Sequence, residues 1–202
     1  MNAALKSIGA SSENQDRGMI ESCGDRTLLC IADGVGGRGG GVEAANLVMR
    51  LVSQNCRKLL CPEDCALFLT DLDRFLANEP TAGETTCVLA VVASNRIWGA
   101  SVGDSGAWVI CSNSLFDLTE NQQRKPYLGS GSARPILFSH PALAGCTILL
   151  ATDGLLKYAP RVEIASICRT LGSDQCARQL VELVRYPSGA LPDDVTVIVL
   201  HL

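Results

Sequence analysis

The feature that most constrains this sequence is residues 28–41, LLCIADGVGGRGGG, where a short apolar run ends in one acid and continues as a loop made mostly of glycine. The residues before Asp33 have no polar break, as expected for a strand that is buried on both faces. Asp33 should therefore lie at the edge of the core, at the end of a rigid element. The glycines that follow let backbone carbonyls approach a ligand closely. A carboxylate beside exposed carbonyls is a set of hard oxygen donors, which suits Mg²⁺ or Mn²⁺.

Two other interpretations of the glycine loop are open. Gly34, Gly36 and Gly39 satisfy the GxGxxG spacing of dinucleotide-binding turns, after a predicted strand and before a predicted helix. That fingerprint also requires an acid about 20 residues further on, and residues 53–57 (SQNCR) contain none. Alternatively, the loop serves only to turn the chain.

Composition limits the class of protein. The chain has 202 residues, enough for one domain, 1–202, with a large core. Apolar residues make up 47% and charged residues 19%, which is typical of a globular chain, and the net charge of −4 argues against a general nucleic-acid binder. No apolar run is long enough for a membrane span, and the first ten residues lack the apolar centre of a signal peptide. We therefore expect a cytoplasmic monomer with neither a nucleic-acid nor a membrane partner.

The ten cysteines are expected to be reduced thiols in such a compartment. Cys56, Cys61 and Cys65 are close in sequence, which leaves a structural zinc site as an alternative. The absence of a CxxC pair and the presence of only two histidines argue against zinc. Three further cysteines lie in apolar runs, where cysteine packs as a small hydrophobic residue: Cys87, Cys146 and Cys168.

Hydrophobic patterning predicts strands, two helices, strands, two helices and a final strand. The strands are expected within 1–12 and near 18–23, 28–33, 85–93, 96–102, 107–111, 146–151 and 195–202. The helices are expected near 41–60, from Pro62 onward with Phe68 and Phe75 on the core side, and near 162–170 and 173–184. The segment 118–134 is predicted to be a loop. Two antiparallel sheets packed together, with a helix pair on each outer face, would bury every apolar face. The predicted fold is α+β, an α-β-β-α four-layer sandwich.

Six acids from distant parts of the chain lie beside predicted strands. They are Asp33 and Asp153 at strand ends, Asp193 and Asp194 before the last strand, Asp16 in a polar segment before the second strand, and Asp104 in a hairpin turn. Each one alone is common in turns, but a shared position beside buried strands suggests a cluster. Clustered carboxylates repel one another, and their pKa values rise unless cations neutralise them. Two divalent ions bridged by a carboxylate form a clamp that is used in phosphate-ester hydrolysis.

The chain resembles the type 2C metal-dependent serine/threonine protein phosphatases, the PPM family, through six motifs. They are ENQD at 13–16, ADGVGG at 32–37, GETT at 83–86, VGDS at 102–105, TDGL at 152–155 and DDVTVIVL at 193–200. The resemblance implies the same four-layer sandwich. It also implies a Mg²⁺- or Mn²⁺-dependent phosphoprotein phosphatase that opposes a serine/threonine kinase. The implied reaction is direct attack of a metal-bound water on phosphorus, without a phosphoenzyme.

The resemblance also implies roles for individual residues. Asp33 would bridge two metal ions, and the carbonyl of Gly34 would complete the shell of one of them. Asp153 and Asp193 would hold the second ion. With Asp16, the three aspartates form the implied catalytic set.

Three further assignments follow from the motifs. Asp193 is chosen over Asp194 because the family's ligand lies three residues before the threonine or serine, here Thr196. Asp16 would orient the attacking water. Asp104 would bind a third, more weakly held ion.

The chain departs from the family pattern at three positions. Ser11 stands where the family has the arginine that grips the substrate phosphate, Gly106 stands where an arginine follows VGDS, and Lys157 replaces an acid that contributes to the third ion. A serine hydroxyl cannot bind phosphate in the bidentate manner of a guanidinium. We hypothesise that Lys157 supplies the charge of the third cation, and that Arg38 or Arg17 binds the substrate phosphate.

Two alternatives to an active phosphoprotein phosphatase are open, and the departures motivate the first. One is a catalytically weakened or inactive phosphatase-like module that regulates or binds phosphoproteins, since fold alone does not imply function. The other is a metal-dependent hydrolase of small phosphate esters.

Overall fold

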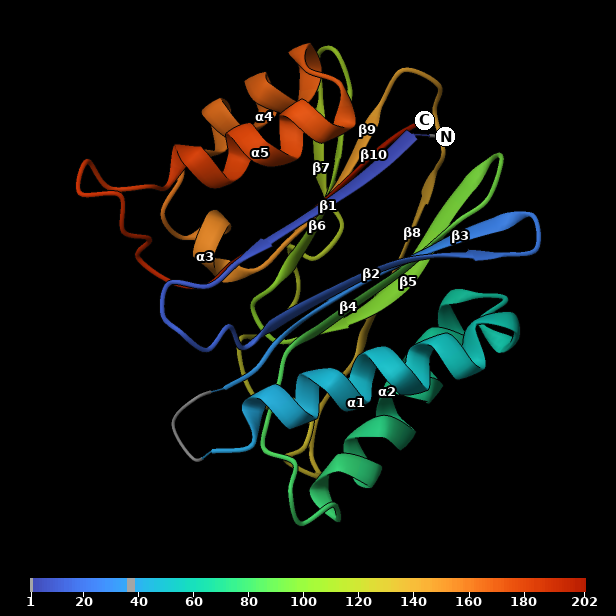
Figure 1. Cartoon of the computed structure of the whole chain (residues 1–202). Helices are drawn as coiled ribbons and strands as arrows, with labels where there is room; N and C mark the ends of the chain where they lie inside the picture. The colour runs from blue at the N-terminus through green and yellow to red at the C-terminus, as the bar shows by residue number, and fades with distance from the viewer. Residues whose placement is uncertain (1, 36–38) are drawn as a thin grey trace.

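The computed structural model describes residues 2–35 and 39–202. Two five-stranded antiparallel sheets pack face to face, and helices cover both outer faces, as Figure 1 shows. The predicted α+β four-layer sandwich is therefore confirmed. No helix in the described part of the chain is long and apolar enough to cross a membrane.

The first sheet has the strand order β1-β10-β9-β6-β7. Its strands are β1 (Asn2–Ile8), β10 (Val195–His201), β9 (Thr147–Ala151), β6 (Gly106–Ile110) and β7 (Leu115–Asp117). Its outer face is covered by α4 (Arg161–Thr170) and α5 (Ser173–Leu183), and the short helix α3 (Asp153–Leu156) follows β9 directly. The helices pack on this sheet because their apolar residues recur on one side, including Ile164, Cys168, Ala177 and Leu180.

The second sheet has the order β2-β3-β4-β5-β8. Its strands are β2 (Asp16–Cys23), β3 (Arg26–Asp33), β4 (Cys87–Val92), β5 (Arg96–Val102) and β8 (Ile136–Pro141). Its outer face is covered by α1 (Gly41–Asn55) and α2 (Pro62–Ala77), with a short 3-10 helix, η2 (Cys56–Lys58), between them. Pro62 begins α2, and two acids in its first turn suit the positive end of the helix dipole.

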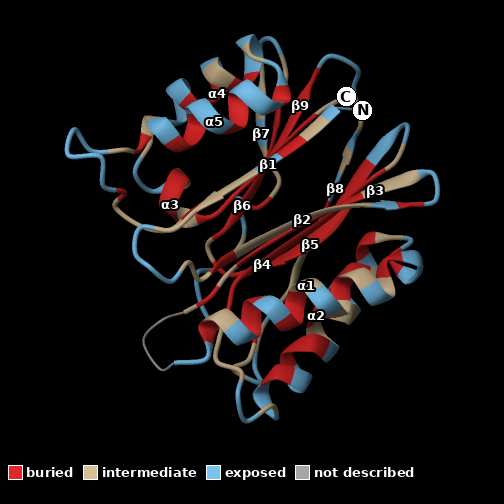
Figure 2. Cartoon of the chain, viewed as in Figure 1, coloured by how far each residue is buried: buried red, intermediate tan, exposed pale blue. Residues whose placement is uncertain are grey.

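The central strand β3 is buried on both faces, as its unbroken apolar run predicts. Leu28 and Cys30 face the α1–α2 layer, whereas Leu29 and Ile31 face the other sheet. All four are fully buried, and Figure 2 shows that burial is concentrated along the strands of both sheets. This packing holds β3 rigidly and fixes the position of Asp33 at its end.

Several local predictions were wrong. The strands β7 and β8 were not predicted, because β7 has only three residues and β8 alternates in exposure at a sheet edge. Asp16 is the first residue of β2 and not part of a preceding loop, because it pairs with β3. Asp153 starts α3 and does not end β9. Phe75 was predicted on the core side of α2, but it lines an open groove beside Leu51 of α1 and is 45% exposed.

The expectation that all ten cysteines are reduced is also contradicted. Cys111 and Cys146 form a disulfide. The physical reason is the register of the sheet: Ile110 pairs with Thr147 across β6 and β9, so the next residue outward on each strand faces its counterpart. Their Cα atoms are 4.3 Å apart, which is typical of directly opposed residues in an antiparallel ladder.

Candidate metal centre

Acids from four parts of the chain line one cavity of about 190 Å³ at the edge where the two sheets meet. The predicted site residues on its wall are Asp33, Gly34, Asp104, Asp153 and Asp193, joined by Asp194. The structure therefore brings together the acids that the sequence pattern singled out. Because they follow or precede buried strands, they are held at the rim of the core.

Asp16 lies beside this cavity, buried under it. Asp16 and Asp33 face each other across β2 and β3, so the strand register places the two carboxyl groups on one side. The side chain of Asp16 is almost fully buried, and its Oδ2 accepts a hydrogen bond of 2.7 Å from the hydroxyl of Thr152. Its Oδ1 is also buried and has no hydrogen-bond partner among the described residues. A buried acceptor without a partner is costly, so this oxygen is suited to a ligand or a water.

The backbone of Asp33 is clamped by the GETT motif. Its N–H donates to Thr86 Oγ1 at 3.0 Å, and its carbonyl accepts from Thr86 N–H at 2.8 Å and from the Thr85 hydroxyl at 2.8 Å. The hydroxyls of Thr86 and Ser105 are 2.7 Å apart, within hydrogen-bond distance. Because Ser105 directly follows Asp104, this bond links the two acidic segments.

Two glycines allow the turn after Asp33. A Cβ added to Gly34 would lie 2.5 Å from the carbonyl group of Gly41, and one added to Gly41 would lie 2.9 Å from the backbone of Gly34 and Val35. Both distances are too short for a side chain, so the first turn of α1 can approach the end of β3 only where both residues are glycine. The close approach of Gly41 thus fixes the position of Gly34, the residue that follows Asp33.

The two adjacent acids before β10 have different environments. Asp194 accepts hydrogen bonds of 2.7 Å from the backbone N–H of Ala10 and of Gln15, so it holds the loop that precedes β2. Asp193 accepts only from the N–H of Asp194 within the described residues. Asp193 is therefore the one with oxygens available to the cavity, which supports choosing it over Asp194.

The acids raise one another's pKa. Burial is the main cause that raises the pKa of Asp33 to about 9, and the charges of Asp16, Asp153, Asp104 and Asp193 add to it. Burial likewise raises the pKa of Asp16 to about 7, against the hydrogen bond from Thr152. The pKa of Asp153 is also raised, by burial and then by its acidic neighbours. Each shift makes the charged form less favourable than in a free aspartate, and bound positive charge would oppose it.

The donor set fits hard divalent cations. Carboxylates and backbone carbonyls are the ligands that Mg²⁺ and Mn²⁺ prefer, and their mutual repulsion is relieved by bound positive charge. No three acidic, histidine or cysteine side chains of the described residues are close enough together to hold an ion in the present arrangement. The carboxylates would therefore have to draw inward around the ions.

A protein-family model decides the classification. The model described as "Stage II sporulation protein E (SpoIIE)" matches residues 24–202. The chain belongs to the SpoIIE family. The chain also resembles serine/threonine phosphatases in sequence and in fold. The family match and this resemblance confirm the predicted membership in the type 2C, or PPM, phosphatases.

One similar relative is the serine/threonine phosphatase stp of Listeria welshimeri, which is 26% identical over 196 residues, with 78% of each chain covered. The crystal structure of a bacterial serine phosphatase bearing an R161E mutation has the same fold, with a TM-score of 0.84 and 24% identity over 100% of this chain and 98% of that one. The catalytic domain of the phosphatase PstP, solved with two manganese ions, has a TM-score of 0.76 and 22% identity, covering 98% of this chain and 96% of that one.

The structure describes the surroundings of two of the three cations that the sequence proposed. Arg38 is outside the described residues. Arg17 is 2.6 Å from Asn46 through its Nε and donates to the backbone carbonyls of Asn14 and Asp16, so its hydrogen bonds serve the fold. Lys157 is exposed, with its ammonium 5.2 Å from the centre of the Tyr158 ring. Among the described cationic side chains, Arg124 forms an ion pair with an acid of the cavity, Asp104.

Sequence reasoning did not identify the hydroxyl partners of the acids, and it named Arg124 only as one basic residue of the loop 118–134 that could contact an acidic substrate. Ser105 and Thr152 each adjoin an aspartate of a motif, and Thr86 belongs to the GETT motif, so these positions were the available signal. Arg124 is in a loop and in no motif. Only its position in space connects it to the site.

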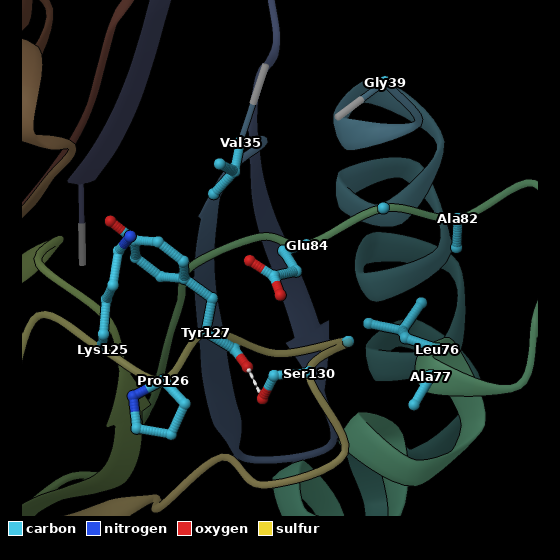
Figure 3. Close-up of a pocket in the computed structure, with 12 residues that line it drawn as sticks. Val35, Gly39, Leu76, Ala77, Ala82, Glu84, Lys125, Pro126, Tyr127 and Ser130 are labelled. Carbon is cyan, nitrogen blue, oxygen red and sulfur yellow. Dashed lines mark hydrogen bonds between the residues drawn. The ribbon is translucent and has the colours of Figure 1, made fainter. Parts of the chain in front are cut away.

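Beside the acidic cavity lies a larger hollow of about 860 Å³. Val35 and Tyr127 line both, so the two spaces adjoin. Figure 3 shows Lys125, Pro126 and Tyr127 on one side of this hollow and Leu76 and Ala77 of α2 on the other, with Glu84 between them. The hollow thus combines apolar walls with one group of each charge.

Proposed function

We propose that this chain hydrolyses phosphoserine and phosphothreonine in proteins at a centre of two Mg²⁺ or Mn²⁺ ions. Asp33, the Gly34 carbonyl, Asp153 and Asp193 would hold the ions. The observation that carries the proposal is the cluster of one buried and two half-buried acids, Asp16, Asp33 and Asp153, whose pKa values are raised by burial and by neighbouring acids. Such a group is stable in its charged form only beside cations.

When bound, the two ions would supply positive charge for the phosphoryl oxygens and lower the pKa of the attacking water. Asp16 would accept a hydrogen bond from that water through its buried Oδ1, which has no partner among the described residues. Thr152 holds the other oxygen of Asp16 and so orients the carboxyl group. Asp104 would bind a third ion only weakly, because Arg124 already neutralises it.

The larger hollow favours a protein substrate over a small phosphate ester. Its volume of about 860 Å³ adjoins the acidic cavity, which leaves room for the polypeptide on either side of a phosphorylated residue. We further propose that residues 1–202 act as one phosphatase domain, that the chain acts as a monomer, and that its activity opposes a serine/threonine kinase. The family model begins at residue 24, and β1 and β2 add one strand to each sheet as well as Asp16.

The test is hydrolysis of p-nitrophenyl phosphate and of a phosphothreonine peptide, with Mn²⁺ and with EDTA. Asp33→Asn should abolish turnover and weaken Mn²⁺ binding measured by calorimetry. Asp25→Asn is the matched control, because that side chain is 96% exposed in the β2–β3 hairpin. It should leave both quantities unchanged.

Three results would count against the proposal. Turnover that persists in EDTA would exclude the two-ion centre. Preference for the small ester over the peptide would favour the small-ester alternative. A folded, Mn²⁺-binding protein without turnover would favour the phosphoprotein-binding module, for which Ser11 in place of the usual arginine is the motivating observation.

A further inference from the structure

Arg124 brings positive charge to the acidic cavity from a loop. It lies in the segment between β7 and β8 and lines the cavity together with Asp33, Asp153 and Asp193. Among the described residues on this wall, it is the one cationic side chain. It does not correspond to any of the motif positions, since the family pattern places its phosphate arginine at residue 11.

Two neighbours hold this side chain in place. Its Nε is 2.8 Å from Asp104 Oδ2 and 3.3 Å from the hydroxyl of Tyr127. A guanidinium carries five N–H donors, and these contacts use only the one on Nε. The terminal nitrogens make no hydrogen bond to the described residues, so four donors remain available. Held at Nε, the planar fork is preorganised for two oxygens of a phosphoryl group.

The other candidate cations are less suitable for this task. The hydrogen bonds of Arg17 go to Asn46 and to backbone carbonyls. Lys157 lies over Tyr158 and is not on the wall of the cavity. The hydroxyl of Ser11 is 3.1 Å from the carbonyl of Glu13 in an exposed turn.

We propose that Arg124 binds the phosphoryl group of the substrate, and that Asp104 and Tyr127 position it. This role compensates for Ser11 and rests on the function proposed above. It also means that Asp104 serves as the anchor of an arginine, so that an ion at Asp104 and the bound arginine exclude each other. The guanidinium would then hold the phosphate beside the acids that would carry the two ions.

The experiment measures inorganic phosphate binding to the Mn²⁺-loaded protein by calorimetry, together with KM and kcat for a phosphothreonine peptide. Arg124→Ala should weaken phosphate binding and raise KM by about 10- to 100-fold, the usual effect of losing a charged, bidentate hydrogen bond. Arg124→Lys should fall between, because it keeps the charge without the fork. Arg74→Ala is the matched control. This arginine is also exposed and paired with an acid, Asp71, and it lines neither the acidic cavity nor the larger hollow.

Folding is not expected to obscure the result, since the side chain of Arg124 is 65% exposed; thermal unfolding of each variant checks this. Unchanged phosphate binding in Arg124→Ala would overturn the proposal, as would the absence of phosphate binding in the wild type. Tighter Mn²⁺ binding as the only effect would mean that Arg124 merely neutralises Asp104. Failure of the proposed function would be distinguishable from failure of this proposal. In that case the wild type would lack turnover, whereas its phosphate binding would still depend on Arg124.

Discussion

Asp33→Asn should stabilise the metal-free protein while it abolishes the metal-dependent activity. Burial and four neighbouring acids raise the pKa of Asp33 from 3.8 to about 9. Its side chain accepts no hydrogen bond from the described residues, so asparagine of the same shape loses nothing there. The substitution removes a group that is poorly placed for folding and well placed for cation binding, as is common at functional sites.

The sign and size follow from proton linkage. An acid whose pKa is raised by folding leaves stability unaffected below its ordinary pKa and lowers it as pH rises towards the folded pKa. Each pH unit above the ordinary pKa lowers the free energy of unfolding by about 1.4 kcal/mol. Between pH 3.8 and pH 7 the decrease is therefore at most about 4 kcal/mol. Because the cavity is open to solvent, which screens the charges, we expect a decrease of about 2 kcal/mol. At pH 4 the two proteins should be nearly equal.

The assay is urea unfolding of wild type and Asp33→Asn in EDTA at pH 4 and pH 7, with Asp25→Asn as control. Excess Mn²⁺ should reverse the order at pH 7, since an ion at 100 times its Kd stabilises the native wild type by about 3 kcal/mol. The reasoning is refuted if Asp33→Asn is no more stable than the wild type at pH 7 in EDTA. A gain that is equally large at pH 4 would also refute it, because the cause would then not be the charge.

Two further predictions concern the loop before β2 and the disulfide. Asp194→Ala should lower the free energy of unfolding by about 2 kcal/mol, because two backbone N–H groups lose a charged acceptor. Asp193→Ala should instead reduce the affinity for Mn²⁺ and lower the free energy of unfolding by less than about 1 kcal/mol. Urea unfolding in EDTA and calorimetry with Mn²⁺ measure both effects, and the opposite ranking would exchange the roles of the two acids. Removing the disulfide by Cys111→Ala with Cys146→Ala should lower the free energy of unfolding by about 2–4 kcal/mol, since the bond joins residues 35 apart. Urea unfolding of the wild type in reductant should show the same decrease. A wild type whose stability is insensitive to reductant would show that the two thiols are free.

Local sequence patterns predicted much of the fold and of the candidate site. The apolar run of β3 and the position of Asp33 at its end are properties of adjacent residues, so they could be predicted. The same holds for the amphipathic helices α1 and α2, whose existence and order were predicted, although the long first helix ends at Asn55 and a 3-10 turn follows. The edge strand β8 lacked such a local signal, because its pattern has only one fully buried residue.

By itself, the sequence determined that a layered α+β fold would place several acids at strand ends, because periodicity and chain order depend on near neighbours. Only the tertiary structure decided what each acid contacts. Asp16 faces Asp33 through the strand register, Asp194 binds backbone 179 and 184 residues away, and Arg124 reaches Asp104 from a loop. The physical reason is that these contacts depend on the register and packing of whole strands. A one-residue change in register would leave the local pattern intact and turn each side chain to the other face.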